Sequence, residues 1–423
     1  MIQLWCRRCA GLRRSLKVGV ALALVCGGLP LASVQAETLI VPSMNVKGRY
    51  DSNVWSRPAQ LLPAGTQLGD FVTSTSGEVR LVHETRDIEA NITVGGGFNA
   101  YVDNTHLNYF NTNVRGYVTL DRWVDQYLRG ARLQFIENFS YTPETPGFIT
   151  GARETVVTSD GFFRGIQGFR AKTIINTTSV IGSYPVSRDL SLEGGYTFAL
   201  RRVGTVQGGV AFTGGAGFFN TDTHTWFGGP RYQLTRNDSI AALYRQTFLL
   251  QERSEGGRLF STNLVVLAGD YTKVFQDWKL SIQGGVTFVE PAGRTFPSGS
   301  IHITTQPERD TVLRMVISRE ARPSYFIQGG ATISHLGLIG ISHRPYERLT
   351  LDGSAAFGYN QLFPNTHQTF QNFTSTASLN YKITRNITGE LSYIYTTIKS
   401  DSSALDYMFS RHQVGFFIRA EWN

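Results

Sequence analysis

The chain is poor in cysteine and in charge. Its three cysteines, Cys6, Cys9 and Cys26, all precede Glu37, the first acidic residue. The remaining sequence therefore has no thiol for a disulfide or for a cysteine metal site. Charged residues make up 17% of the 423 residues, against about 25% in an average soluble domain. Both deficits argue against a disulfide-rich or strongly charged soluble protein.

A large basic excess is also missing once the charges are located. The net charge is +8, but five of the 40 basic residues lie before Glu37, so only 35 basic side chains face 32 acidic ones afterwards. The five are Arg7, Arg8, Arg13, Arg14 and Lys17. Basic residues at the extreme N-terminus are typical of an export signal. We therefore expect no nucleic-acid partner.

No apolar run reaches the length of a membrane-spanning helix. The apolar stretch 18–25 follows the basic N-terminus and leads to small residues that end at Ala36. This order predicts a secretory signal peptide at 1–36, cleaved after Ala36, and a mature domain at 37–423. The alternative, an N-terminal anchor, needs about 20 apolar residues, and Pro30 interrupts this run.

Alternation with a period of two is what the sequence has instead. In 278–289, apolar residues occupy the even positions from Trp278 to Phe288, and mostly polar residues occupy the odd ones. The segments 88–99, 373–383 and 413–422 repeat the pattern. Such strands suit a wall with lipid on one side and water on the other. Because lipid offers no partner for free backbone groups, strands cross a membrane only as a closed barrel.

The connections between the alternating segments are of two kinds. Short polar turns are expected at 86–87, 121–125, 187–189, 236–238, 276–277, 308–310, 345–348 and 385–386. Longer connections are expected around 52–71, 103–106, 143–169, 204–219, 253–258, 291–297, 321–328, 363–369 and 399–405. We predict an all-β, transmembrane, antiparallel up-and-down β-barrel of 18 strands, with short periplasmic turns and longer extracellular loops.

Two alternative architectures share part of this pattern. Weak alternation near 258–275 and 329–343 leaves a 16-stranded barrel as the second choice. A soluble β-sandwich or propeller would share the alternation, but the sequence has no blade repeat of about 40–50 residues. The location predicted from the signal peptide and the strands together is the outer membrane of a Gram-negative cell.

Candidate functional side chains follow from the two faces of the wall. An 18-stranded barrel is too wide for side chains to fill, so its interior is a channel or holds an inserted segment. We expect Glu89, Arg115, Arg132, Arg314, Glu320 and Lys382 to line this lumen. Aromatic residues beside the short turns are expected to form the periplasmic girdle, namely Trp123, Tyr127, Trp278, Tyr346, Tyr381 and Trp422.

Catalytic and cofactor motifs are weak. The eight histidines include no His-x-x-x-His pair, and there is no Gly-x-Ser-x-Gly elbow. We expect no metal, no cofactor and no enzyme activity. The alternative is an outer-membrane hydrolase that uses His335 beside Ser334 or His343 beside Ser342. The connection 143–169 is the best candidate to fold into the pore, and an external loop is the other interpretation.

Two stretches resemble a known family. The opening Met44–Trp55 contains Tyr-Asp-Ser-Asn-Val-Trp, and Gly228–Tyr232 leads into Leu234–Ile240 and Leu243–Arg245. Both are similar to segments of a bacterial family of putative beta-barrel porins and exopolysaccharide-operon outer-membrane proteins. The C-terminus, Glu421-Trp422-Asn423, departs from the commonest ending that the barrel-assembly machinery recognises, because its aromatic residue is penultimate.

This resemblance implies a conduit for exopolysaccharide export. A periplasmic polysaccharide-export protein would then pass a glycan chain to the barrel. The residues themselves are equally compatible with a general or solute-specific diffusion porin. Besides these, the expected partners are outer-membrane lipid and the barrel-assembly machinery.

Overall fold

The computed structural model describes residues 37–143, 171–206, 219–253, 260–290, 292–324, 330–364, 368–401 and 407–422. The strands are β1 (Glu37–Asp51), β2 (Asp70–Glu84), β3 (Glu89–Tyr101), β4 (Tyr109–Thr119), β5 (Arg132–Thr142), β6 (Ala171–Pro185), β7 (Leu190–Val206), β8 (Phe219–Gln233), β9 (Asp238–Arg253), β10 (Phe260–Val274), β11 (Trp278–Glu290), β12 (Arg294–Glu308), β13 (Thr311–Pro323), β14 (Ala331–Tyr346), β15 (Leu349–Phe363), β16 (Thr369–Lys382), β17 (Ile387–Asp401) and β18 (Tyr407–Glu421). The connections contain the 3-10 helices η1 (Ala59–Leu61) and η2 (Thr105–Leu107) and the short helix α2 (Asp121–Asp125).

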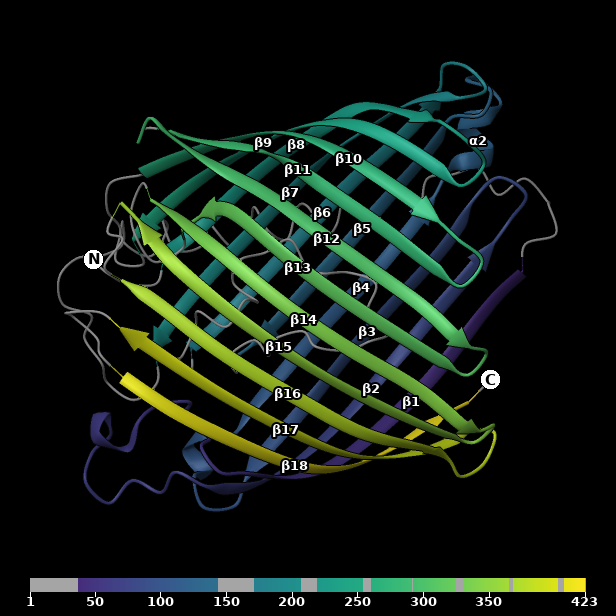
Figure 1. The fold of residues 1–423 in the computed structure, drawn as a ribbon. Helices are drawn as coiled ribbons and strands as arrows, with labels where there is room; N and C mark the ends of the chain where they lie inside the picture. Colours follow the sequence, from purple (N-terminus) through teal and green to yellow (C-terminus); the bar gives the residue numbers. More distant parts are fainter. Residues whose placement is uncertain are drawn as a thin grey trace, which may run out of the picture.

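The strands form one closed antiparallel barrel (Figure 1). Each strand pairs with its neighbours in sequence, and β1 pairs with β18, so the sheet closes on itself. This confirms the predicted 18-stranded barrel, and the 16-stranded alternative is wrong. The two segments with weak alternation form β10 and β14, since pairing on both sides outweighs their irregular pattern.

Four of the short turns share one hydrogen-bonding pattern. A hydroxyl at the start of the turn accepts hydrogen bonds from the backbone N–H groups two and three residues later. The hydroxyls belong to Thr85, Ser187, Thr235 and Thr384. Serine and threonine favour tight turns in this way because they satisfy backbone donors locally.

Two predicted connections differ from the structure. The expected turn 121–125 is the helix α2, within a longer connection between β4 and β5. The expected loop 291–297 is shorter, because β12 already begins at Arg294 and pairs with β11 through Pro297. Proline is tolerated there because, among the described residues, β12 pairs with β13 only from Gly299 onward.

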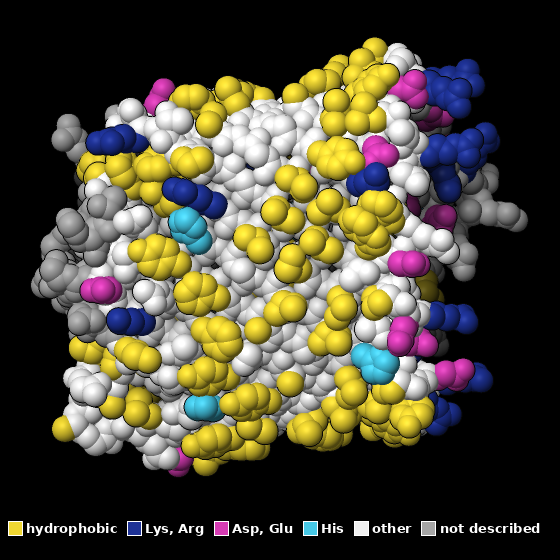
Figure 2. Space-filling model, viewed as in Figure 1, with side chains coloured by type: hydrophobic (Ala, Val, Ile, Leu, Met, Phe, Trp, Pro, Cys, Tyr) yellow, Lys and Arg dark blue, Asp and Glu magenta, His cyan; other side chains and the backbone are white. Residues whose placement is uncertain are grey.

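The two faces of the barrel differ in chemistry. Large hydrophobic side chains such as Phe110, Ile339 and Phe416 are more than half exposed on one face. The alternate positions carry polar residues, of which Ser43, Asn45 and many others are buried. Figure 2 shows the hydrophobic outer wall, with charged side chains gathered along the short-turn edge. The apolar face is therefore the lipid-facing surface, and the polar face lines the lumen. In the described part of the chain, no helix is long and apolar enough to span a membrane.

Candidate functional site: the barrel lumen

The strand register places all six predicted lumen residues on the inner face. Glu89, Arg132 and Lys382 lie at the short-turn ends of their strands. Arg132 borders a hollow of about 960 Å³ that it shares with α2 and the β2–β3 turn. Arg115 and Arg314 lie further along β4 and β13, and Glu320 lies near the opposite end of β13. All six residues thus lie on the inner face, but they do not form one cluster.

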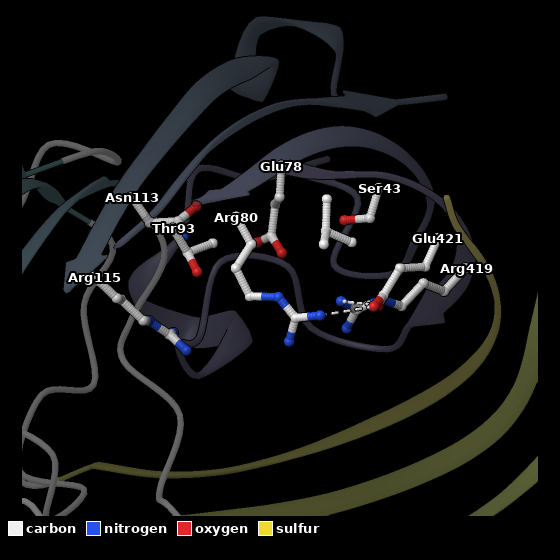
Figure 3. A pocket seen from close by; sticks show the side chains of 9 residues that line it. Ser43, Glu78, Arg80, Thr93, Asn113, Arg115, Arg419 and Glu421 are labelled. Carbon is white, nitrogen blue, oxygen red and sulfur yellow. Dashed lines mark hydrogen bonds and ion pairs between the residues drawn. The ribbon is translucent and has the colours of Figure 1, made fainter. Parts of the chain in front are cut away.

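Arg115 belongs to a charged group on the inner wall where the barrel closes (Figure 3). This seam cluster comprises Glu78, Arg80, Arg115, Arg419 and Glu421 and borders a hollow of about 170 Å³. Glu421 accepts from Arg80 at 2.9 Å through one oxygen and from Arg419 at 3.0 Å through the other. Three guanidinium groups therefore face two carboxylates. The excess positive charge suits the binding of carboxylate or phosphate groups on a passing solute.

A second charged group lies on the inner wall of β7–β11. Arg231 on β8 donates to Glu193 on β7 at 2.7 Å and contacts Asp270 on β10 at 3.4 Å. Ser281 on β11 donates to the same aspartate at 3.1 Å. Because the carboxylates compensate this arginine, the group joins neighbouring strands and adds no net positive charge to the lumen.

The lumen is constricted where β9 approaches β13. The side-chain amide of Gln251 on β9 donates to the carbonyl oxygen of Ser324, just beyond β13, at 2.7 Å, and both residues are fully buried. Four strand steps of about 4.8 Å would keep these strands roughly 19 Å apart along an open wall. The contact therefore requires the wall to fold inward.

Charged side chains accompany this constriction. Arg245, about midway along β9, lies within electrostatic reach of Glu320 and Arg322 on β13. Arg322 in turn donates through Nε to Glu320 at 2.9 Å. The constriction is possible because β12 and β13 separate above the Gly299–Arg319 pair, which leaves the end of β13 paired with β14 alone. A solute crossing the lumen would pass two arginines and one glutamate here.

The Tyr-Asp-Ser-Asn-Val-Trp motif joins β1 to β18 at the long-loop end of the barrel. Asp51, the last residue of β1, is fully buried and accepts from Arg411 Nε at 2.9 Å and from Gln413 at 2.9 Å on β18. Asn53 donates from its side chain to the carbonyl of Arg57 at 2.7 Å and so shapes the following loop. The motif therefore connects the first strand to the last.

Two apolar residues of the motif pack against the inner wall. Val54 and Trp55 form a buried cluster with Val72, Tyr101 and Leu107 from β2, β3 and η2. Asp70 fixes the second loop of this cluster, because its carboxylate accepts backbone N–H groups from residues 102–104. The loops after β1 and β3 are thereby held together at the mouth, a contact that no sequence pattern predicts.

The pKa of Asp51 follows from these contacts. β1 has 15 residues, more than the 9–11 or so that cross a membrane, and Asp51 lies beyond that span at the mouth. Burial raises the pKa of its carboxyl, but the guanidinium of Arg411 and the charge of Arg49 lower it by more, so the pKa lies below the usual value. Asp51 is therefore a carboxylate at neutral pH.

The six predicted girdle aromatics all lie at the short-turn end. Their exposed fractions range from 38% for Trp278 to 72% for Tyr127 and Tyr346. Trp123 on α2 contacts Tyr127 edge to face, with ring centroids 5.4 Å apart. Tyr381 and Trp422 complete the set beside the β16–β17 turn and the end of β18. Their contact with the membrane interface stays a prediction.

The candidates for hydrolysis do not assemble. His335 and Ser334 are adjacent on β14 and so point to opposite faces of the sheet, as do His343 and Ser342. The His343 ring instead pairs with Thr311 at 2.8 Å. Among the described residues no group of three His, Cys, Asp or Glu side chains could hold a metal. The predicted pore loop 143–169 lies, beyond its first residue, outside the described residues.

The C-terminal third of the chain matches a known family. Residues 300–420 match the model of the family described as "Putative beta-barrel porin 2". The resemblance to a beta-barrel porin family is thereby confirmed. The match covers β13–β17 and parts of β12 and β18. The chain is therefore a β-barrel that is porin-like over this matched part.

Solved structures similar to this barrel come from Acinetobacter baumannii and Pseudomonas aeruginosa. The siderophore receptor PirA from Acinetobacter baumannii is 7% identical, with 92% of this chain and 81% of that chain covered and a TM-score of 0.46. OpdQ from Pseudomonas aeruginosa is 10% identical, with 92% and 97% covered and a TM-score of 0.45. OccK2 (OpdF) from Pseudomonas aeruginosa, solved with glucuronate, is 10% identical, with 91% and 98% covered and a TM-score of 0.44. No curated protein matches the chain.

Proposed function

We propose that the barrel is a conduit for the export of an exopolysaccharide across the outer membrane. The observation that carries the proposal is the inner wall, which carries many hydroxyl and amide side chains, with arginines gathered at a few places. Hydroxyl pairs such as Ser179–Thr197 and Ser354–Thr376 join adjacent strands across this face. A hydrated glycan can exchange water for such groups with little net change in free energy, and so it can slide.

The charge of the wall favours a glycan that carries acidic groups. Arg80, Arg115 and Arg419 outnumber the acids of the seam cluster, and Arg245 and Arg322 outnumber Glu320 at the constriction. Guanidinium forks bind carboxylates with defined geometry, but a passing chain must also leave. Glu421 holds two of the three seam arginines, which moderates their affinity for the polymer.

The short-turn end would receive the chain from the periplasm. The hollow beside α2 is lined by charges of both signs, including Arg86, Asp87, Arg122 and Asp125. Mixed charge on an accessible surface suits a reversible protein contact. A periplasmic polysaccharide-export protein is the partner that we propose for this surface.

Gene deletion tests the proposal. In the deletion strain, surface exopolysaccharide should disappear and glycan should accumulate in the periplasm, and a plasmid copy of the chain should restore export. Uptake of small solutes should stay normal. Unchanged secretion in the deletion strain would overturn the proposal.

A diffusion porin for small anions is the second candidate, since the arginine excess of the seam cluster would favour it equally. It predicts that the deletion strain loses growth on a particular anionic solute and keeps its surface polysaccharide. Ion conductance alone does not separate the two functions, because any open aqueous barrel conducts.

A further inference from the structure

The outer wall has a hollow that lies away from the lumen and so has no role in the proposed transport. Its volume is about 630 Å³, and it lies over β11–β15 on the lipid-facing side. Ile282, Ile301, Ile317 and Phe357 line it from four strands. Gly337 leaves a gap between the last two, and a Cβ atom added there would meet no other atom within 4 Å.

A basic pair lies directly beside this groove. Arg319 on β13 pairs across the sheet with His335 on β14, and both side chains point to the outer face. Arg319 is exposed. The outward-facing neighbours on this row are Gly299 on β12 and Tyr359 on β15, and none of them is acidic. An exposed arginine in a lipid-facing wall thus has no carboxylate opposite it on the adjacent strands.

The basic pair lies above the apolar groove, as the headgroup of a lipid lies above its acyl chains. Arg319 lies nine residues from the short turn at Asp310, so with the usual strand rise and tilt it stands roughly 20–25 Å above that turn. This is near the upper border of an apolar band about 25 Å tall. The apolar groove residues Ile317 and Ile301 lie on the next row toward the short turns, below the arginine.

We propose that this groove binds one phosphate-bearing lipid of the outer leaflet. The phosphate would sit at Arg319, with His335 beside it, and one acyl chain would lie in the groove over Gly337. Charge complementarity favours an anionic headgroup, because an arginine at the membrane surface is stabilised by a phosphate partner. The alternative occupant is a second copy of the barrel, which would have to place an anionic group opposite Arg319. The experiment below distinguishes the two occupants.

Native mass spectrometry of the intact barrel tests this proposal. The barrel is released from detergent with diphosphorylated lipid A, or with the same lipid after removal of its phosphates. Wild type should retain one diphosphorylated lipid and bind the phosphate-free form at least tenfold less. Arg319→Gln should reduce binding of the diphosphorylated lipid at least tenfold, and Arg309→Gln, in the β12–β13 turn, should leave it unchanged.

A second variant separates the groove from the charge. Gly337→Leu places an apolar side chain in the hollow at a position where an added Cβ meets no atom within 4 Å, so the barrel should fold normally and retain less lipid of either form. Inorganic phosphate should not displace the lipid from wild type, because it makes no use of the groove. Equal retention by wild type and both variants would overturn the proposal, as would a dimer that buries this face in place of lipid.

Discussion

Replacement of Asp51 by asparagine should weaken the barrel seam. The carboxylate is fully buried and is held by Arg411 and Gln413 from β18 and by the backbone of Asn53. Asp51→Asn keeps the shape but removes the charge, and it takes from the Arg411 guanidinium, which is only 13% exposed, the carboxylate that it contacts. Breaking one half of a buried ion pair costs about 3–5 kcal/mol. We therefore expect a loss of about 3 kcal/mol in the free energy of unfolding.

Urea unfolding of the barrel in detergent micelles, followed by tryptophan fluorescence, measures this loss. Trp55 is buried in the adjacent cluster and reports on the same end of the barrel. The matched control is Glu421→Gln, because its partners Arg80 and Arg419 are 42% and 41% exposed and Glu421 is 27% exposed. Each such exposed pair contributes at most about 1 kcal/mol. If Asp51→Asn unfolds within 0.5 kcal/mol of wild type, roughly the scatter expected of neutral surface changes, the reasoning is refuted.

Three further outcomes are expected. Since the pKa of Asp51 is lowered in the fold, its contribution to stability is present above the unfolded value of 3.8 and is lost as the pH falls below that value. The free energy of unfolding should therefore fall more between pH 7 and pH 3 in wild type than in Asp51→Asn. Equal falls in the two proteins would contradict this. Arg115→Glu reverses one charge of the seam cluster and should lower the anion-to-cation permeability ratio in planar bilayers at least twofold; an unchanged ratio would place Arg115 outside the ion path. Gln251→Ala removes the contact with Ser324 and should raise single-channel conductance, whereas wild-type conductance would show that the contact does not limit the pore.

The sequence was sufficient for the fold because a barrel repeats one simple rule. Alternation such as that from Trp278 to Phe288 assigns each residue to a face, and turn residues such as Thr85 and Thr384 mark strand ends. Strand count and closure follow from the number of segments. β12 departs from the predicted loop 291–297 because proline usually marks a loop, whereas the strand edge that is unpaired above Gly299 accepts Pro297.

The site was less accessible from the sequence. Period two places Arg115 and Glu320 on the inner face, but which inner residues meet depends on register and on curvature. The seam cluster joins β4 to β18 across the closure, and the Gln251–Ser324 contact joins residues 73 positions apart. The resemblance at Tyr-Asp-Ser-Asn-Val-Trp did mark an important segment, although its partner Arg411 became visible only in the closed barrel.

The central claim is that glycan passes through this lumen, and blocking the lumen tests it most directly. No cysteine occurs after Cys26, so a single introduced cysteine is the only thiol in the described barrel. Thr247→Cys places it on the inner face of β9 between Arg245 and Gln251, and Ser410→Cys places it on the outer face of β18. A bulky thiol reagent added to cells should reduce polysaccharide export at least tenfold in the Thr247→Cys strain and leave export by the Ser410→Cys strain unchanged. Continued export from cells whose Thr247→Cys barrels are fully labelled would contradict the claim.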